Sequence, residues 1–213
     1  MANQILAVDL SVQKKYQQIL TEQSKNTDEL PLAVIPGIDI KEERLAQEVK
    51  KSFIQFLIKQ FRHAKSKTYD LSKDQRELDF RTTKYHIKLD PSDNDIAIKM
   101  CTLCRGYCCY RGEKYAYITP TMLKQIIQKN AKKSILSIVR TYTNDLPQHY
   151  IKGSCVYHTD KGCSLTPDFR SDVCNNFYCK PLAEAIKDIR KQPKEKRCVI
   201  AKNESYVVNS AVI

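Results

Sequence analysis

The sequence predicts an α+β protein in which a helical N-terminal segment packs on a small, loop-rich cysteine domain with short strands. Apolar residues recur at helical spacing near the N-terminus and again in the middle of the chain, whereas short alternating stretches bounded by turn residues appear later. Eight of the nine cysteines fall between residues 101 and 179, and the first 100 residues contain none. We therefore expect a mainly helical region at 1–95, a cysteine domain at 96–182, and a C-terminal helix and hairpin at 183–213.

The N-terminal region is expected to hold two helices joined by an extended arm. Apolar spacing predicts the first helix over 4–22, and the polar, Pro-flanked stretch 23–37 predicts an extended linker. A longer amphipathic helix is predicted over 39–63, with Asp39 as its N-cap and Glu42 three residues later. Its apolar residues recur on one face, which indicates a core helix: Leu45, Val49, Phe53, Phe56, Leu57 and Phe61.

Short strands are expected on both sides of the first cysteines. Partial alternation predicts a strand over 81–89, and the stretch 90–95, rich in Asp and Asn, predicts a turn. Residues 96–100 would then complete a hairpin that leads into Cys101. A further short strand is expected over 114–118.

The rest of the chain is expected to begin with a helix over 120–140. Thr119 is a favourable N-cap, Pro120 suits the first helical position, and Asn130 marks a break. Shorter elements follow: a loop at 144–154, strands at 155–158 and 162–165 joined by a turn, a helical turn from Arg170 that carries Cys174, a helix at 181–191, and a hairpin formed by 198–201 and 206–208.

The cysteine distribution favours metal binding over other uses of thiols. Disulfides need an oxidising compartment, and the first ten residues have neither the basic segment nor the long apolar run of a signal peptide, so we expect a cytoplasmic protein. The apolar runs are too short to span a membrane. In a reducing compartment, grouped thiols most often bind metal or carry out redox chemistry. Redox thiols, disulfides and buried core cysteines are the alternatives.

The spacing of the cysteines defines a candidate ligand set. Cys101 and Cys104 are separated by two residues, as in a metal knuckle whose tight turn directs both sulfurs at one ion. Cys108 and Cys109 are adjacent, so we expect them to serve different metals unless one of them packs in the core. Soft thiolates suit an iron–sulfur cluster or zinc. The candidate metal ligands are Cys101, Cys104, Cys108, Cys109, Cys155, Cys163, Cys174 and Cys179.

One ordered block of motifs covers residues 100–182. It consists of the opening from Cys101 to Cys109, Ile118-Thr119-Pro120 at a helix start, Gly153-Ser154-Cys155, Gly162-Cys163, Arg170 four residues before Cys174, and Cys179. This block resembles the YkgJ-like cysteine-cluster family, which is described as zinc- or iron-chelating. The chain departs from the family pattern in a longer spacing before the cysteine pair, in Ser171 where the family has Pro, and in Tyr178 before the last cysteine. The resemblance implies a metal-binding domain at 96–182 and does not assign an activity.

Other side chains near the cysteines have a structural and a functional interpretation. His158 is expected on a strand surface, with metal ligation as the alternative. Arg170 would pair with a neighbouring aspartate or donate to the sulfurs. Cys198 lies outside the block and is expected to be a buried apolar residue or a spare thiol, and Ser154 has no base partner that the sequence reveals.

The charge distribution adds a second expectation. The chain holds 36 Lys and Arg against 24 Asp and Glu, a net charge of +12. Residues 1–100 hold 17 basic and 15 acidic side chains, whereas residues 101–213 hold 19 and 9. A basic C-terminal half is typical of binding to nucleic acid or another polyanion, although metal-bound thiolates would offset part of this charge. The densest basic run, 187–197, would either contact a polyanion or form a solvated helix end.

Three classes of function are compatible with these observations. The favoured class is a metal-binding protein that acts in electron transfer or iron handling. The second is a metalloenzyme of the protein-modifying type, because some proteins with related cysteine clusters are linked to protein lysine methylation, although no site for a methyl donor is recognisable. The third is a nucleic-acid-binding module in which the metal only holds the fold. The sequence contains no GxSxG motif, phosphate loop or dinucleotide fingerprint.

Overall fold

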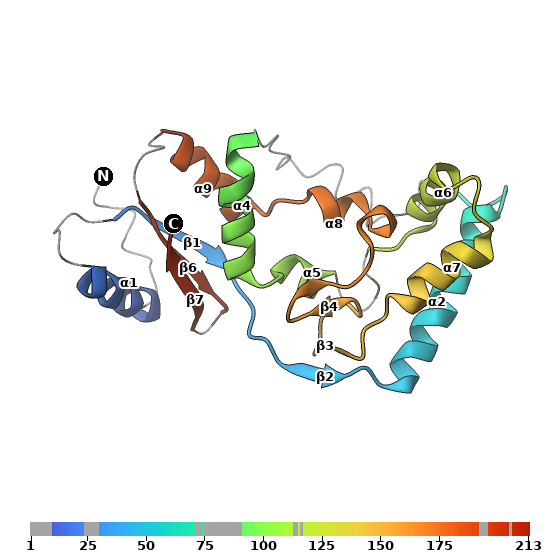
Figure 1. Cartoon of the computed structure of the whole chain (residues 1–213), viewed down its shortest axis with the longest axis horizontal. Coiled ribbons are helices and arrows are strands. Elements are labelled where there is room, and N and C mark those ends of the chain that lie inside the picture. The colour runs from blue at the N-terminus through green and yellow to red at the C-terminus, as the bar shows by residue number, and fades with distance from the viewer. Residues whose placement is uncertain are drawn as a thin grey trace. The chain divides into compact units, whose positions relative to one another are not determined.

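The computed structural model describes residues 10–23, 30–70, 74, 91–112, 115, 117–191, 196–204 and 206–213. In this part of the chain the protein has an α+β fold of helices and small sheets (Figure 1). The chain divides into two compact units, each assembled from segments that are far apart in the sequence. Unit 1 comprises Met1–Asp39, Ile87–Tyr107 and Tyr178–Ile213, and unit 2 comprises Ile40–His86 and Cys108–Phe177. Unit 1 thus contains segments from all three regions expected at 1–95, 96–182 and 183–213, and unit 2 contains segments from the first two.

The described helices and strands are short, apart from one long helix. The helices are α1 (Leu10–Gln23), α2 (Gln47–Lys65), α4 (Pro91–Cys104), α5 (Tyr107–Arg111), α6 (Pro120–Lys129), α7 (Ile135–Asn144), the 3-10 helix η4 (Pro167–Phe169), α8 (Asp172–Asn176) and α9 (Lys180–Lys191). The strands are β1 (Leu32–Pro36), β2 (Glu42–Arg44), β3 (His149–Ile151), β4 (His158–Thr159), β5 (Gly162–Cys163), β6 (Cys198–Lys202) and β7 (Val207–Val212).

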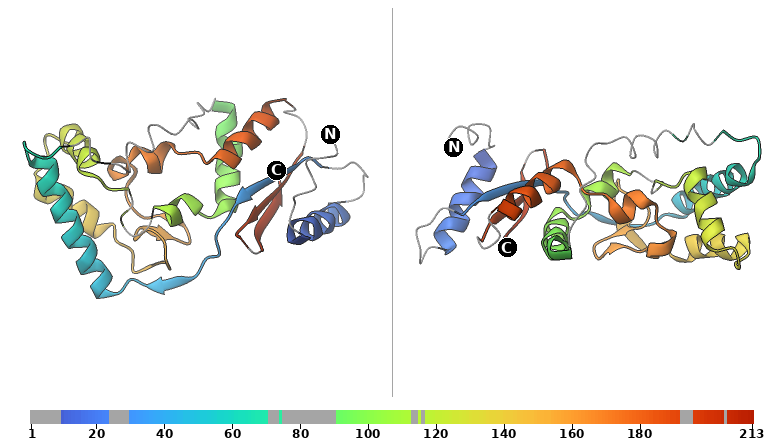
Figure 2. Two further views of the ribbon diagram at one scale, coloured as in Figure 1. Left: turned by 180° about the vertical axis from the view of Figure 1, so that it is seen from behind. Right: turned by 90° about the horizontal axis from the view of Figure 1, so that it is seen from above.

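Unit 1 is a three-stranded sheet covered by helices on both faces (Figure 2). The central strand β6 runs parallel to β1 and antiparallel to β7. Alternate residues of a strand point to opposite faces. Accordingly, Cys198 and Ile200 pack in the cluster that includes Val12 of α1, whereas Val199 packs in the cluster that includes Met100 of α4 and residues of α9. Strand β6 is therefore buried on both sides.

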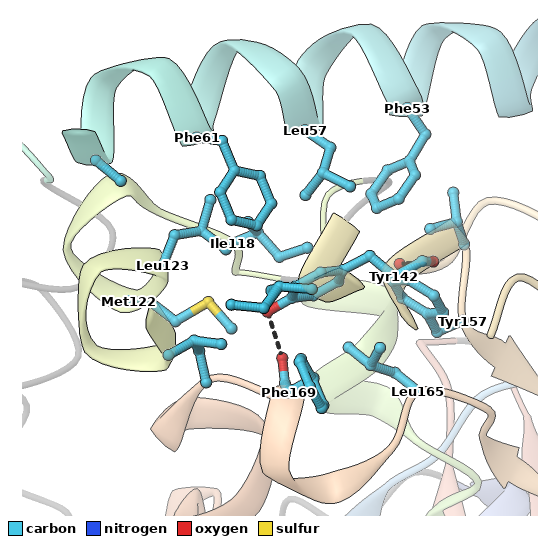
Figure 3. Packing of buried hydrophobic residues seen from close by; sticks show 14 of the residues in the cluster. Phe53, Leu57, Phe61, Ile118, Met122, Leu123, Tyr142, Tyr157, Leu165 and Phe169 are labelled. Carbon is cyan, nitrogen blue, oxygen red and sulfur yellow. Dashed lines mark hydrogen bonds between the residues drawn. The ribbon is translucent and has the colours of Figure 1, made fainter. Parts of the chain in front are cut away.

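Unit 2 is built on an aromatic core between α2, α6, α7 and the loop that follows β3. Figure 3 shows Phe53, Leu57 and Phe61 of α2 directed at this core. The buried hydroxyl of Tyr142 donates a hydrogen bond of 2.8 Å to the carbonyl oxygen of Phe169 (Figure 3). The helices supply the apolar surface, and this hydrogen bond holds η4 against α7. The loop after β3 is held by Tyr157, whose hydroxyl donates to the carbonyl oxygen of Tyr142 over 2.7 Å.

Several elements predicted from local signals are confirmed. Thr119 caps α6 by accepting a hydrogen bond of 3.2 Å from the backbone N–H of Met122, and Asn130 ends that helix. The predicted helix at 181–191, the helical turn that carries Cys174 and the C-terminal hairpin also form. The hairpin predicted around the turn 159–162 is present as β4 and β5, which are shorter than expected. Helix α1 is described from residue 10 onward, and β1 lies within the expected extended arm.

The predicted helix at 39–63 begins eight residues late. Glu42 to Arg44 forms strand β2, which pairs antiparallel with β3 inside the expected loop at 144–154. The hydroxyl of Tyr150 donates to Glu43 over 2.7 Å across this pair. Asp39 is not a helix cap, because α2 begins at Gln47 with Ala46 at its N-cap position; Asp39 instead accepts a hydrogen bond from Tyr206. A strand partner more than a hundred residues away overrides the local helix signal here.

Residues 91–100, expected as part of a turn and the second strand of a hairpin, instead form helix α4. Pro91 occupies its first position, where proline is well tolerated. The helix buries Ala97 and Met100 and leaves Ile98 63% exposed, so the apparent alternation of apolar residues was misleading. The expected strand at 81–89 lies outside the described residues. None of the described residues in the expected strand at 114–118 is extended in a sheet, and Tyr117 has a left-handed φ of 55°.

Candidate metal centre

Five of the eight candidate ligands line one cavity in unit 2. The cavity measures about 40 Å³, and its thiols are Cys108, Cys109, Cys155, Cys163 and Cys174. A volume of this size exceeds the roughly 10–15 Å³ that one water molecule needs. Cys155 is buried, whereas Cys108 and Cys174 are exposed, so the thiols extend from the core of unit 2 to its surface. The structure thus brings together residues that are spread over 67 positions of the sequence, from 108 to 174.

Four separate segments contribute these thiols. Helix α5 carries Cys108 and Cys109, a turn after β3 carries Cys155, β5 carries Cys163, and α8 carries Cys174. The backbone N–H of Cys155 donates to the carbonyl oxygen of Cys109 over 3.3 Å. This hydrogen bond ties the turn to α5 and fixes the spacing of their side chains.

Polar groups also approach two of the sulfurs. The hydroxyl of Ser171, which caps α8, donates to the sulfur of Cys174 over 3.2 Å. The backbone N–H of Tyr157 points at the sulfur of Cys155 over 3.5 Å. Donors of this kind stabilise sulfur when it carries negative charge, as it does in a metal-bound thiolate.

Arg170 supports the cavity wall through the backbone. Its guanidinium group donates to the carbonyl oxygens of Leu165 (2.7 Å) and Cys163 (3.1 Å). The sequence predicted either a pair with a neighbouring aspartate or donation to sulfur; the hydrogen bonds found run to main-chain oxygens instead. The cation also lines the cavity and offsets part of the burial that raises the pKa of Cys163.

The pKa values of the adjacent thiols Cys108 and Cys109 in α5 are shifted in opposite directions. A hydrogen bond from the thiol of Cys109 lowers the pKa of Cys108 to about 7, and the same contact raises the pKa of Cys109. Burial raises the pKa of Cys155. Burial also raises the pKa of Cys174, to about 11, so Cys108 is the thiol of this cavity whose pKa is lowered.

A glycine and a strained tyrosine complete the wall. A Cβ atom at Gly112 would lie 2.6 Å from Cε2 of Tyr117, so only glycine fits there. Tyr117 holds a left-handed backbone conformation that is unusual for an aromatic residue. Both residues line the cavity. Backbone strain of this kind concentrates at functional sites.

Sequence reasoning missed a buried pair beside the cavity. His158 is 3% exposed and Ser154 is 1% exposed, and the Ser154 hydroxyl lies 2.8 Å from Nδ1 of His158. His158 is therefore not on a strand surface, and Ser154 does have an imidazole partner. The four-residue spacing was visible in the sequence, but the turn that brings the two side chains together was not.

The other three candidate ligands lie in unit 1. Cys101 and Cys104 occupy the last turn of α4 rather than a tight knuckle turn, at a spacing that places both on one helix face. Cys104 and Cys179 pack against the same apolar cluster. The ninth cysteine, Cys198, is fully buried in the centre of the sheet, which confirms the prediction of a buried apolar residue.

The fold and the cavity define an α+β protein with a thiol-lined site. Among the residues that the structure describes, no group of three or more His, Cys, Asp or Glu side chains is arranged to hold a metal ion. No described helix is long and apolar enough to cross a membrane. No family model, curated protein or solved structure matches the chain. The resemblance to the YkgJ-like family therefore stays a prediction based on the motifs of residues 100–182.

Proposed function

We propose that the cavity in unit 2 binds a thiolate-held metal cofactor, and that the protein acts in electron transfer or iron handling. The observation that carries this proposal is the meeting of five thiols from four segments at one cavity. A cavity lined by so many soft donors has few uses besides binding a soft metal. The donors that approach the sulfurs of Cys155 and Cys174 are suited to stabilising thiolates.

We favour an iron–sulfur cluster over a single zinc ion as the occupant of this cavity. Four thiolates at the Zn–S distance of about 2.3 Å lie about 3.8 Å from one another and leave no space between them. Here the thiols surround about 40 Å³ of space, and no described set of three or more such side chains is arranged around one ion. A cluster bridged by inorganic sulfide holds its cysteine ligands farther apart. Zinc is the alternative cofactor.

The division of the cysteines between the two units suggests which of them would bind each metal. Cys108, Cys109, Cys155, Cys163 and Cys174 exceed by one the four thiolates that a cluster takes. We propose that one of the adjacent pair in α5 is the spare thiol, because neighbouring cysteines point in different directions. Cys101, Cys104 and Cys179 are proposed as ligands of a further metal.

Anaerobic purification followed by metal and sulfide analysis tests this proposal. We expect iron and acid-labile sulfide in equal, stoichiometric amounts, together with a brown colour and a visible charge-transfer spectrum. Stoichiometric zinc without sulfide would show that the cofactor is zinc rather than an iron–sulfur cluster. A colourless, metal-free protein that is fully folded and has free thiols would refute the proposal.

A further inference from the structure

Three of the six cations in the densest basic run, 187–197, make contacts within unit 1. Arg190 forms an ion pair with the buried carboxylate of Asp93. Lys191 pairs with Asp188 at 2.9 Å. Arg197 is 6% exposed and donates to the carbonyl oxygen of Asp188. Arg190 and Arg197 are therefore held by contacts within unit 1, whereas Lys191 stays exposed in a surface pair.

Exposed basic residues gather instead on the helices of unit 2. Helix α2 has a single acidic residue, Glu48, and the stretch 119–144, which contains α6 and α7, has none. The basic residues of these helices are Lys50, Lys51, Lys59, Arg62, Lys65, Lys124, Lys129, Lys132, Lys133 and Arg140. All of them are exposed except Lys50, which is partly buried. We call this set the helical basic surface.

The packing of unit 2 keeps these cations in solvent. Helices α2, α6 and α7 all bury their apolar sides in one core (Figure 3). Their lysines and arginines, apart from Lys50, are exposed. With about 100° per residue, Lys51, Arg62 and Lys65 fall within an arc of about 60° on α2, and with a rise of 1.5 Å per residue they extend over about 21 Å. None of these three side chains forms an ion pair with a described residue.

We propose that the helical basic surface binds the phosphodiester backbone of a nucleic-acid duplex. A duplex carries one negative charge per about 1.7 Å of its axis, so a cationic row of this length faces many phosphates. Proteins that hold single strands usually add exposed aromatic side chains for stacking on the bases. The aromatic residues of α2 and α7 serve the core instead: Phe53, Phe61 and Tyr142 are buried, and Phe56 stacks on Tyr115 at 4.2 Å. The surface is thus suited to phosphate rather than to bases.

Charge-matched variants of the full chain separate this surface from net charge. One triple variant removes three cations of α2 (Lys51→Gln, Arg62→Gln, Lys65→Gln). A second removes three cations of α6 and the turn after it (Lys124→Gln, Lys129→Gln, Lys132→Gln). The control removes three exposed cations of α9 in unit 1 (Lys180→Gln, Lys187→Gln, Lys191→Gln) and causes the same change in net charge. Circular dichroism verifies that each variant is folded.

Fluorescence anisotropy with short duplex DNA and duplex RNA of random sequence, over a range of salt concentrations, measures binding. We expect each variant of the helical basic surface to weaken duplex binding about tenfold or more and to lower the salt slope by about 3, one for each lysine or arginine removed. The α9 control should change affinity less than about twofold.

Three results would refute the proposal. The first is wild-type protein that shows no duplex binding at low salt. The second is an α9 control that loses as much affinity as the two surface variants, because binding would then follow net charge alone. The third is binding to phosphatidylglycerol vesicles that is as tight as binding to duplex and equally sensitive to the surface variants, which would make the partner a membrane. Because the assay reads nucleic acid and not metal, its outcome is independent of the proposed cofactor.

Discussion

The backbone N–H of Cys155 donates a hydrogen bond to the carbonyl oxygen of Cys109 over 3.3 Å. These residues are 46 positions apart, and both side chains line the thiol cavity of unit 2. Because the hydrogen bond joins main chains, the relative position of α5 and the turn after β3 does not depend on either side chain. A variant that removes a thiol should therefore alter the proposed cofactor site while leaving this framework in place.

The first prediction concerns the ligands. Cys174→Ala should lower cofactor content about tenfold or more, because loss of a ligand costs at least as much as loss of a group that orients one. Cys198→Ala is the matched control, since Cys198 is buried in unit 1 and away from the cavity lining. It should keep the cofactor and lose about 1 kcal/mol of stability through the small void it leaves. Iron, sulfide and zinc analysis of both variants makes the comparison, and equal loss in both would remove the distinction between Cys198 and the ligand set.

The second prediction concerns cofactor removal. Segments around β4, β5 and α8 should lose hydrogen-exchange protection when the cofactor is stripped, because they are short and are joined by loops. Helix α2 should stay protected, because it contains no cysteine and its apolar face packs in the aromatic core. Hydrogen exchange with and without cofactor measures this. Unchanged protection around Cys163 and Cys174 would mean that the cofactor sits in a preformed site, which favours a redox or catalytic role over a structural one.

The third prediction concerns the ion pair of unit 1. Asp93→Asn should destabilise unit 1 by about 2–3 kcal/mol, because Asp93 is 4% exposed and accepts several hydrogen bonds from Arg190. Asp188→Asn is the control: Asp188 pairs with Lys191 in solvent and should cost less than about 0.5 kcal/mol. Urea denaturation of both variants gives the two free energies of unfolding, and similar values would show that burial of Asp93 contributes little.

The fourth prediction concerns the cavity wall. Gly112→Ala should displace Tyr117, because the new Cβ atom would lie 2.6 Å from its ring. We expect a cost of about 1–3 kcal/mol together with lower cofactor retention. The double variant with Tyr117→Ala should recover part of the lost stability, because the clash is then removed. If the two sites were independent, the losses of the two single variants would add instead. Thermal melts and metal analysis of the two single variants and the double variant test this prediction.

Local signals in the sequence were sufficient for part of the fold. Thr119 and Pro120 start α6, and Asn130 ends it, because capping and backbone preferences act within one helical turn. The same is true of α9, whose apolar positions recur at helical spacing. The eight cysteines proposed as ligands also include all five thiols of the cavity, although the sequence did not say which of the eight meet there.

Burial and pairing decided what local signals could not. Residues 91–95 have the composition of a turn, yet the packing of Ala97 and Met100 in unit 1 makes them the start of α4. His158 has the pattern of a surface residue, yet the turn after Ser154 buries it. In each case the energy gained from burial or from a new hydrogen bond exceeds the small intrinsic preference of the segment.

The sequence by itself determined that thiols and basic residues are concentrated in particular stretches, because composition needs no folding to be read. Only the tertiary structure decided which of these residues lie together. It placed Cys108, Cys109, Cys155, Cys163 and Cys174 at one cavity and Cys101, Cys104 and Cys179 in the other unit. It also paired Arg190 with Asp93 while leaving the cations of α2 in solvent. The physical reason is that ligand sets and ion pairs depend on distances between residues far apart in the chain, and those distances exist only after the strands have paired and the helices have packed.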